Sequence, residues 1–347
     1  MRVGVLTVQV PFVRGGAEAH AENLRQALRQ CGHEAEIISV PFSWYPPDLM
    51  ADQMLACQLL DIEESCGVRI DRVIGLKFPA YLVPHAEKVL WILHQHRSAY
   101  DLWEKPHGDL HPHPLGAEVA RLIRNADTAL LPQARRIYAN SRNVANRLSH
   151  FCGIESTPLY HPPPQAEQYR WLEDGDYLLV PGRVNALKRQ DLVIRALAHT
   201  HHPVRVCFIG APDERKYFEE IYQLSRHLPP GRVQWLGQVS EAEKLRLFGS
   251  CLGVVVTPVD EDYGYVALEA MLASKPVVTC TDSGGPLEFV VHGETGLICL
   301  PEPQALAEAM DALWNDRLRA RQQGRHGRAA YDALELTWDR VVETLLA

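Results

Sequence analysis

The chain has 347 residues, of which 46% are hydrophobic and 22% charged, and its formal net charge is −8. This is ordinary globular composition, and the length favours two domains of ~100–200 residues each. The negative charge, with no long basic block, argues against nucleic acid as a partner. No apolar run approaches the ~20 residues that span a bilayer as a helix.

Two further features bear on the compartment. The N-terminal run Met1–Val8 is short and strand-like, whereas a signal peptide has a longer apolar region. Eight cysteines are scattered through the sequence with no C-x-x-C pair among them. This distribution predicts reduced thiols in a cytoplasmic protein, with neither a zinc site nor a disulfide framework.

Strand and helix patterns alternate in the first half of the chain. The apolar run Val3–Val10 precedes a helical pattern over Ala17–Cys31, and Gly32 is a good residue to end that helix. Further short strands are expected at Glu36–Val40, Arg72–Leu76, Lys88–Leu93 and Arg136–Asn140. Such alternation predicts an α/β domain with a parallel, doubly wound sheet over residues 1–164.

A second alternation follows a break. Tyr160–Pro164 interrupts regular structure, and Gln165–Asp176 has the composition of a polar linker. Strands are then expected at Tyr177–Val180, Val204–Ile209, Val233–Leu236, Leu252–Thr257, Pro276–Thr279 and Thr295–Cys299. We therefore expect a second Rossmann-like domain over 177–329, and one helix over 330–347.

Two glutamates eight residues apart, Glu261 and Glu269, are the most informative feature of the sequence. The apolar strand pattern before Glu261 places it in the loop at a strand's carboxyl end, where open α/β sheets bind ligands. Glu269 falls within the helical pattern that follows. A helical path between them would rise roughly 12 Å, which suits two carboxylates holding opposite ends of one elongated ligand.

This arrangement, followed by the strand Pro276-Val277-Val278, resembles the retaining family 4 glycosyltransferases. The resemblance implies a GT-B fold, with two Rossmann-like domains facing a cleft and a C-terminal helix that crosses back to the N-terminal domain. It also implies a nucleotide-sugar donor. In that family the glutamate matching Glu261 binds hydroxyls of the transferred sugar, and the one matching Glu269 binds the ribose diol.

Basic residues follow the first strand of the second half. Arg183 comes directly after Pro181-Gly182, and Lys188 lies five residues further on. Arginine and lysine at a strand's carboxyl end can neutralise a pyrophosphate. The pair resembles the family's donor-diphosphate element. A solvated loop with two cations is the alternative, and the nearby glutamates favour the phosphate interpretation.

Three glycine-containing turns lie where a strand pattern passes into a helix. Gly15-Gly16 permits close backbone approach at a helix N-terminus and resembles the family's N-terminal glycine loop, which touches donor phosphate. The backbone of Tyr263, Gly264, Tyr265 and Val266 opens the helix that carries Glu269, so its N–H groups can bind phosphate. Ser283–Glu288 resembles the family's closing loop. Simple tight turns explain the glycines in Gly15-Gly16 and Ser283–Glu288 nearly as well.

His94 follows the strong strand Lys88–Leu93, at a position from which a side chain would enter the expected cleft. Family 4 enzymes carry a histidine after a comparable strand, near the reacting centre. The resemblance therefore assigns a catalytic role to His94, with His96 as the alternate. A structural histidine with satisfied hydrogen bonds is the competing interpretation.

Three short patterns have the residue types of metal ligands: His94-Gln95-His96, His111-Pro112-His113 and Asp260-Glu261-Asp262. The last resembles the Asp-x-Asp motif of GT-A transferases, which hold a divalent cation. That motif accompanies a different nucleotide site, and Arg183 with Lys188 can supply the same positive charge. We therefore expect no metal and no cofactor other than the donor substrate.

Two arginine-rich stretches are candidates for contact with anionic lipid: four arginines within 121–136, and five within 317–328. Solvated helix faces are the simpler explanation. Peripheral contact with the inner face of a membrane stays open, because glycosyltransferases with lipid-linked acceptors often dock there.

The predicted function is metal-independent, retaining transfer of a hexose from a nucleoside-diphosphate sugar to the hydroxyl of a glycan, a lipid-linked acceptor or a small molecule. One alternative is a nucleotide-sugar epimerase of GT-B fold, which would convert the donor with no acceptor present. The other is an inactive nucleotide-sugar-binding partner subunit. Asp262 and Tyr263 stand where the family usually has glycine and phenylalanine, so the sequence does not specify the sugar.

Overall fold

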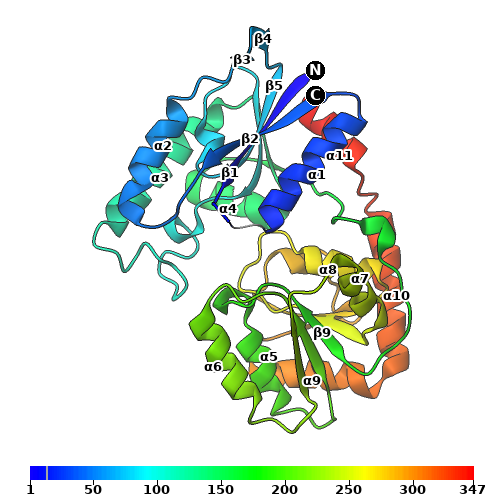
Figure 1. Cartoon of the computed structure of the whole chain (residues 1–347). Helices are drawn as coiled ribbons and strands as arrows, with labels where there is room; N and C mark the ends of the chain where they lie inside the picture. The colour runs from blue at the N-terminus through cyan, green and yellow to red at the C-terminus, as the bar shows by residue number, and fades with distance from the viewer. Residues whose placement is uncertain (13–14) are drawn as a thin grey trace. The chain divides into compact units, whose positions relative to one another are not determined.

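The computed structural model describes residues 1–12 and 15–347. They form two compact units (Figure 1). The first comprises Met1–Pro164 together with Leu336–Ala347, and the second comprises Gln165–Glu335. Each unit is built on its own six-stranded sheet.

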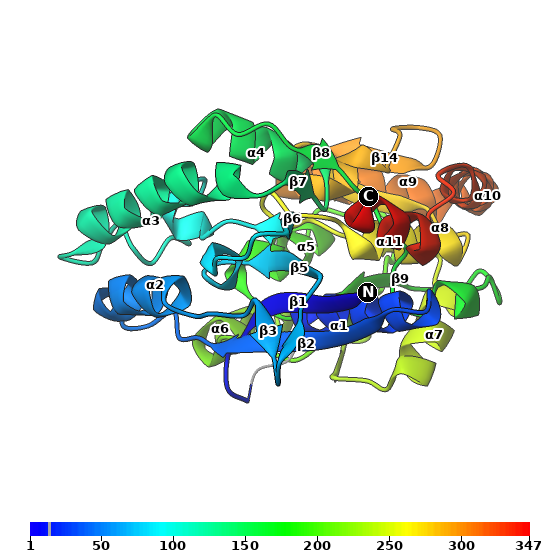
Figure 2. The same cartoon turned by 90° about the horizontal axis from the view of Figure 1, so that it is seen from above.

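The sheet of the first unit is parallel, in the order β2-β1-β5-β6-β7-β8, which can be followed across the sheet in Figure 2. Its strands are β1 (Arg2–Gln9), β2 (Glu34–Pro41), β5 (Arg72–Lys77), β6 (Lys88–His94), β7 (Arg136–Ala139) and β8 (Thr157–Pro158). The central strands are apolar and buried on both faces, as parallel sheets covered by helices require. The predicted parallel α/β sheet is confirmed.

Helices cover this sheet, and alternate residues of its strands enter two separate apolar clusters. Leu6 and Val8 of β1 belong to one cluster, whereas Val3 and Val5 belong to the other. The period of two follows from strand geometry. The remaining elements are α1 (Gly16–Gln30), α2 (Met50–Gln58), α3 (Gly116–Leu130), α4 (Arg142–Cys152), α11 (Trp338–Leu346) and a small hairpin, β3 (Glu64–Ser65) with β4 (Val68–Arg69).

The second unit has a parallel sheet in the order β11-β10-β9-β12-β13-β14. Its strands are β9 (Leu178–Pro181), β10 (Val206–Ile209), β11 (Val233–Gly237), β12 (Gly253–Val255), β13 (Val277–Cys280) and β14 (Gly296–Cys299). Its helices are α5 (Gln190–Leu197), α6 (Arg215–Ser225), α7 (Glu241–Ser250), α8 (Tyr265–Leu272), α9 (Pro303–Asn315) and α10 (Arg317–Ala333).

In order along the chain, the six strands of this sheet are arranged 3-2-1-4-5-6. This is the dinucleotide-binding order, in which the connections reverse direction between the first and fourth strands. Here those strands are β9 and β12, which pair directly. The loops that follow them diverge at this point, and ligands of open α/β sheets bind beside such loops.

The prediction of one helix over 330–347 is wrong. Helix α10 ends at Ala333, Glu335 has a φ of 48°, and α11 begins only at Trp338. Thr337 caps α11, because its side chain accepts a hydrogen bond from the N–H of Arg340 at 3.3 Å. Within the first unit α11 packs beside α1.

The stretch Gln165–Asp176 is also not a loose polar linker. The Tyr169 side chain is buried against Phe248, with ring centroids 5.5 Å apart. The N–H of Leu172 donates to the carbonyl of Gly249 at 2.9 Å. The segment is therefore part of the second unit, fixed along the end of α7.

Candidate donor site

The pairing of Lys188 with Glu261 lies at the centre of the site. Their side chains form an ion pair between the loop after β9 and the loop after β12. The Asn185 side chain accepts a hydrogen bond from the backbone N–H of Lys188 at 3.1 Å, which orders the short turn that carries the lysine. Lys188, the predicted phosphate-binding residue, and Glu261, the predicted sugar-binding residue, therefore lie together at the switch point of the sheet.

The backbone of Glu261 is fixed by the neighbouring loop after β13. Its N–H donates to the carbonyl of Ser283 at 2.9 Å, and its carbonyl accepts from the N–H of Gly285 at 2.7 Å. These bonds extend the sheet beyond β12 and β13, with Glu261 opposite Gly284. The predicted closing loop is therefore attached directly to the residue that is expected to hold the sugar.

Arg183 follows β9 as expected, but its guanidinium lies against Asp213, with Nη1 and Oδ2 3.0 Å apart. Asn185 donates to the same carboxylate at 2.9 Å. The Arg183 side chain is 55% exposed, so it is accessible to a ligand. Of the two predicted phosphate-binding cations, the structure thus brings Lys188 to Glu261 and places Arg183 beside Asp213.

Arg189 links three loops through the hydrogen bonds of its guanidinium. Its position in the sequence does not indicate this role. Its guanidinium binds both oxygens of Asp282, at 2.8 and 2.7 Å. It also donates to the carbonyls of Thr257 and Pro258, at 2.6 and 2.8 Å. The residue adjacent to Lys188 therefore ties the carboxyl ends of β9, β12 and β13 to one another.

Glu269 lies in α8, and only 4% of its surface is exposed. Its Oε1 is 2.7 Å from Nζ of Lys244 in α7, and the Tyr169 hydroxyl also hydrogen-bonds to the carboxylate. Burial, with the charge of Glu269 as the next cause, raises the pKa of Tyr169, so this hydroxyl stays protonated and donates. A carboxylate accepts about four hydrogen bonds, so capacity remains for a ligand diol.

The turn that opens α8 is packed without spare room. Gly264 is the N-cap with a φ of 97°, a backbone conformation that favours glycine. Tyr263 is buried and packs edge-on against Tyr265 and Phe289, with centroids 5.0 and 5.8 Å away. Because α8 begins after β12, its first N–H groups, including those of Tyr265 and Val266, lie at the carboxyl end of the sheet, where they suit a phosphate.

Replacing Gly285 with alanine should destabilise the second unit and impair the site. A Cβ at this position would lie 2.4 Å from the carbonyl oxygen of Tyr263, a contact that only backbone movement can relieve. Overpacking of this kind costs about 1–3 kcal/mol. Thermal unfolding would measure it, with Gly327→Ala as a control, because that glycine is also outside the left-handed region and a Cβ there comes no nearer than 3.4 Å to another atom. Equal stability of Gly285→Ala and wild type would contradict this packing.

In the first unit, His94 is the last residue of β6 and is half-buried. Its Nδ1 donates to the carbonyl of Gln95 at 2.7 Å, which fixes the orientation of the ring. The His96 ring packs edge-on against Phe78 at 5.3 Å, and burial lowers the pKa of His96. A histidine ring held in this way can hydrogen-bond to a sugar hydroxyl.

The predicted N-terminal glycine loop lies at the start of α1. Gly16 is the first helical residue, and the preceding residues 13–14 lie outside the described chain. The N–H of Gly15 donates to the Glu18 carboxylate at 2.7 Å. One of the N–H groups that would receive a phosphate is therefore already hydrogen-bonded to an acidic side chain.

The histidines whose sequence pattern suggested metal ligands make other contacts in the structure. The His111 ring packs edge-on against Trp103, with centroids 5.0 Å apart, and His113 lies 3.5 Å from the Asp48 carboxylate. Within residues 1–12 and 15–347, no group of three or more histidine, cysteine or acidic side chains is arranged to hold a metal ion.

Several of the clustered arginines are used inside their own units. Arg124 donates to the carbonyl of Ala99 at 2.6 Å, and Arg321 lies over the Trp171 ring at 4.7 Å. Arg328 pairs with Asp332 at 3.0 Å. These contacts favour structured helix faces over a lipid-binding patch. In the part of the chain that the structure describes, no helix is both long and apolar enough to cross a membrane.

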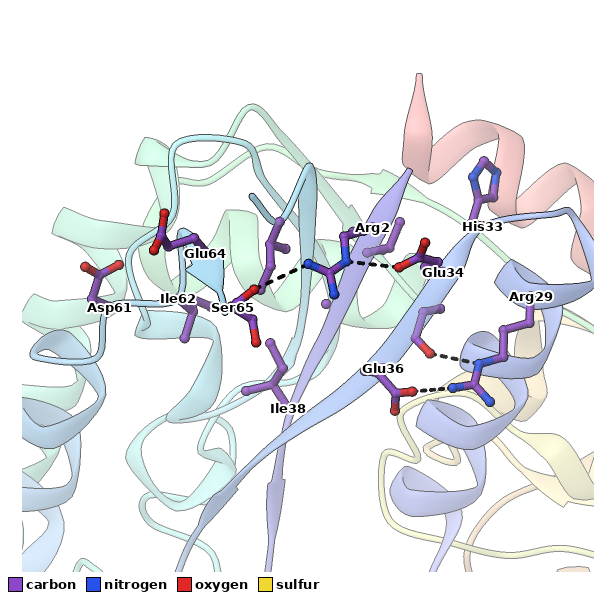
Figure 3. Close-up of a pocket in the computed structure, with 14 residues that line it drawn as sticks. Arg2, Arg29, His33, Glu34, Glu36, Ile38, Asp61, Ile62, Glu64 and Ser65 are labelled. Atoms are coloured by element: carbon purple, nitrogen blue, oxygen red, sulfur yellow. Dashed lines mark hydrogen bonds and ion pairs between the residues drawn. The ribbon is translucent and has the colours of Figure 1, made fainter. Parts of the chain in front are cut away.

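A pocket of about 600 Å³ lies elsewhere in the first unit, near the amino ends of β1 and β2 (Figure 3). Its charged walls largely neutralise each other: Arg2 pairs with Glu34, and Arg29 pairs with Glu36. His94, by contrast, ends β6 at the carboxyl edge of the same sheet. The pocket therefore contributes no residue to the predicted chemistry.

The two doubly wound parallel sheets define a protein of the GT-B class. Among solved structures, the Anabaena Alr3699/HepE complex with UDP and glucose superposes with a TM-score of 0.71. The superposition covers 100% of this chain and 99% of that one, at 20% sequence identity. The WaaG glycosyltransferase of lipopolysaccharide biosynthesis gives a TM-score of 0.73 over 99% of both chains, at 14% identity. These likenesses establish the fold.

Residues 163–330 match the family model of glycosyl transferases group 1. The human alpha-1,3/1,6-mannosyltransferase ALG2 is 33% identical over 132 residues, which are 36% of this chain and 32% of the human protein. The match thus spans about a third of that relative. An uncharacterised glycosyltransferase of Methanocaldococcus jannaschii is 25% identical over 91% of this chain and 90% of its own length.

Proposed function

We propose that the protein is a retaining glycosyltransferase that moves a hexose from a nucleoside-diphosphate sugar to an acceptor hydroxyl. The observation that carries the proposal is the Lys188–Glu261 pair at the switch point of a sheet with dinucleotide-binding order. The match to the family model and the fold support it, as does the UDP complex of the structurally similar Anabaena protein.

The roles follow from where each group lies. Lys188 and the accessible Arg183 offer positive charge to the donor diphosphate, together with the first N–H groups of α8. Glu261 offers its carboxylate to sugar hydroxyls beside that diphosphate. Glu269 is buried within α8, where its charge is balanced by Lys244, and it accepts the ribose hydroxyls.

These residues contribute to the reaction mainly by electrostatic stabilisation. As the bond from sugar to phosphate breaks, negative charge grows on the leaving diphosphate, and fixed cations stabilise that charge without reorganising. In same-face displacement the acceptor hydroxyl attacks the sugar, and the leaving phosphate takes the proton of that hydroxyl. His94, whose ring orientation is fixed by the carbonyl of Gln95, is expected to bind a hydroxyl of the sugar and orient it.

Transfer should proceed in excess EDTA at close to the untreated rate. The physical reason is that Lys188 and Arg183 supply the positive charge that a divalent cation supplies in GT-A enzymes. The assay is product formation with and without chelator. A full loss of activity that manganese or magnesium restores would show that Asp260-Glu261-Asp262 is a metal site after all.

Thermal-shift screening against UDP-, GDP- and ADP-sugars tests the proposal and identifies the donor. A donor at a hundred times its dissociation constant should stabilise the protein by about 2.7 kcal/mol. The stabilising donor is then incubated with the enzyme, first alone and then with candidate acceptors. Conversion of the donor alone into an epimer would indicate the epimerase, whereas binding without any turnover would indicate an inactive partner subunit.

A further inference from the structure

Two cysteines face each other at the carboxyl end of the second sheet. Cys280 is the last residue of β13 and Cys299 the last residue of β14, and the two are direct partners in the parallel register. Neighbouring strands lie about 4.8 Å apart, which is within the Cα separation of about 4.4–6.8 Å that a disulfide spans. Both side chains contribute to the same apolar cluster, so they lie on the same face of the sheet.

The two thiols already interact. Cys280 hydrogen-bonds to Cys299, and this bond raises the pKa of Cys280 and lowers the pKa of Cys299. The positive charge of Arg189 lowers the pKa of both thiols, and the negative charge of its partner Asp282 raises it. Cys299 is on the edge strand and partly exposed, whereas Cys280 is fully buried. Cys299 is therefore the thiol that an oxidant reaches first, and Cys280 is the resolving partner.

Hydrogen bonds and an ion pair connect Cys280 to the donor site. The N–H of Cys280 donates to Oγ of Ser283 at 3.2 Å, and the carbonyl of Ser283 accepts from Glu261. Asp282, two residues after Cys280, holds Arg189, the residue next to Lys188. A change at the end of β13 must therefore reach the loops that carry Lys188 and Glu261.

We propose that Cys280 and Cys299 form a reversible disulfide that weakens diphosphate binding at the neighbouring donor site. A peroxide is the oxidant. The Cys299 thiolate attacks one peroxide oxygen and becomes a sulfenic acid, releasing water, and Cys280 then attacks that sulfur and releases a second water. Two thiols lose two electrons and two protons, and one hydrogen peroxide becomes two waters.

The effect on affinity follows from geometry and rests on the proposed function, whereas the disulfide itself does not. A disulfide draws the two Cβ atoms to about 3.8 Å and so displaces the strand end that Ser283 and Asp282 follow. The bonds from that loop to Glu261 and Arg189 hold the site in its binding arrangement. Displacing them should weaken diphosphate binding by roughly tenfold.

The first test is chemical and needs no substrate. The full chain is treated with hydrogen peroxide, digested without reduction, and its linked peptides are identified by mass spectrometry. We expect a Cys280–Cys299 link that dithiothreitol releases. Oxidation confined to the exposed Cys31 and Cys66, or a link between other cysteines, would overturn the disulfide.

The second test is calorimetry of UDP, GDP and ADP with reduced, oxidised and re-reduced protein. We expect weaker binding after oxidation, recovery with dithiothreitol, and no response to peroxide in Cys299→Ser. The matched control Cys31→Ser, which changes an exposed thiol of the first unit, should respond like wild type. Equal affinity with a mapped disulfide would overturn the coupling. A reduced protein that binds none of the three nucleotides would instead refute the donor site and leave the disulfide map unaffected.

Discussion

Replacing Glu261 with alanine should abolish sugar transfer and leave binding of the free nucleoside diphosphate nearly unchanged. Glu261 is expected to contact the sugar, which a free diphosphate lacks. Its carboxylate also pairs with Lys188, so its removal leaves that cation for phosphate. Transfer assays and calorimetry with the diphosphate measure the two effects separately.

Glu269→Ala provides the contrast, because this residue is expected to contact the ribose of any bound nucleotide. Loss of a polar contact of this kind costs about 1–3 kcal/mol, so diphosphate binding itself should weaken. The variant also removes the nearer of the two carboxylates that pair with the half-buried Lys244, the other being Glu241 at 3.9 Å, so Lys244→Met is the control for that loss. Equal losses of diphosphate affinity in Glu261→Ala and Glu269→Ala would show that the two glutamates do not grip opposite ends of one ligand.

The sheets could be predicted because their strands are short, continuous apolar runs, which buried parallel strands require. The expected run Val3–Val10 differs from β1 by one residue at each end, and Arg72–Leu76 differs from β5 by one. The break within 330–347 was missed because it depends on local conformation. Glu335 has positive φ and Thr337 serves as a cap, and neither residue is by itself a strong helix breaker.

The site could be predicted only where its residues stand close together in the sequence. Glu261 and Glu269 share one loop and helix, and Arg183 and Lys188 share another loop. Lys244 and Tyr169 could not be found in this way, because they lie 25 and 100 residues from Glu269 and only folding brings them to its carboxylate.

Arg189 illustrates a different limit. It follows Lys188 directly, so a third cation in the same loop was indistinguishable from a solvated arginine. What distinguishes it is the set of acceptors it reaches, namely the Asp282 carboxylate and the carbonyls of Thr257 and Pro258. Those acceptors are 68 to 93 residues away, and no local pattern in the sequence records them.

Lys188→Ala and Arg183→Ala should each weaken binding of the sugar donor and of the free diphosphate to the same extent. Both cations are expected to contact phosphate and neither to contact the sugar. Loss of a charge-assisted hydrogen bond costs about 1.5–3 kcal/mol, with the larger value expected for Lys188, because it is less exposed than Arg183. Calorimetry with both ligands measures this, and Arg195→Ala, a surface arginine of α5, is the matched control. Unchanged diphosphate affinity in both variants would show that neither cation binds the phosphates. If only the affinity for the sugar donor fell, we would conclude that these cations contact the sugar. The sugar is the only part of the donor that the free diphosphate lacks.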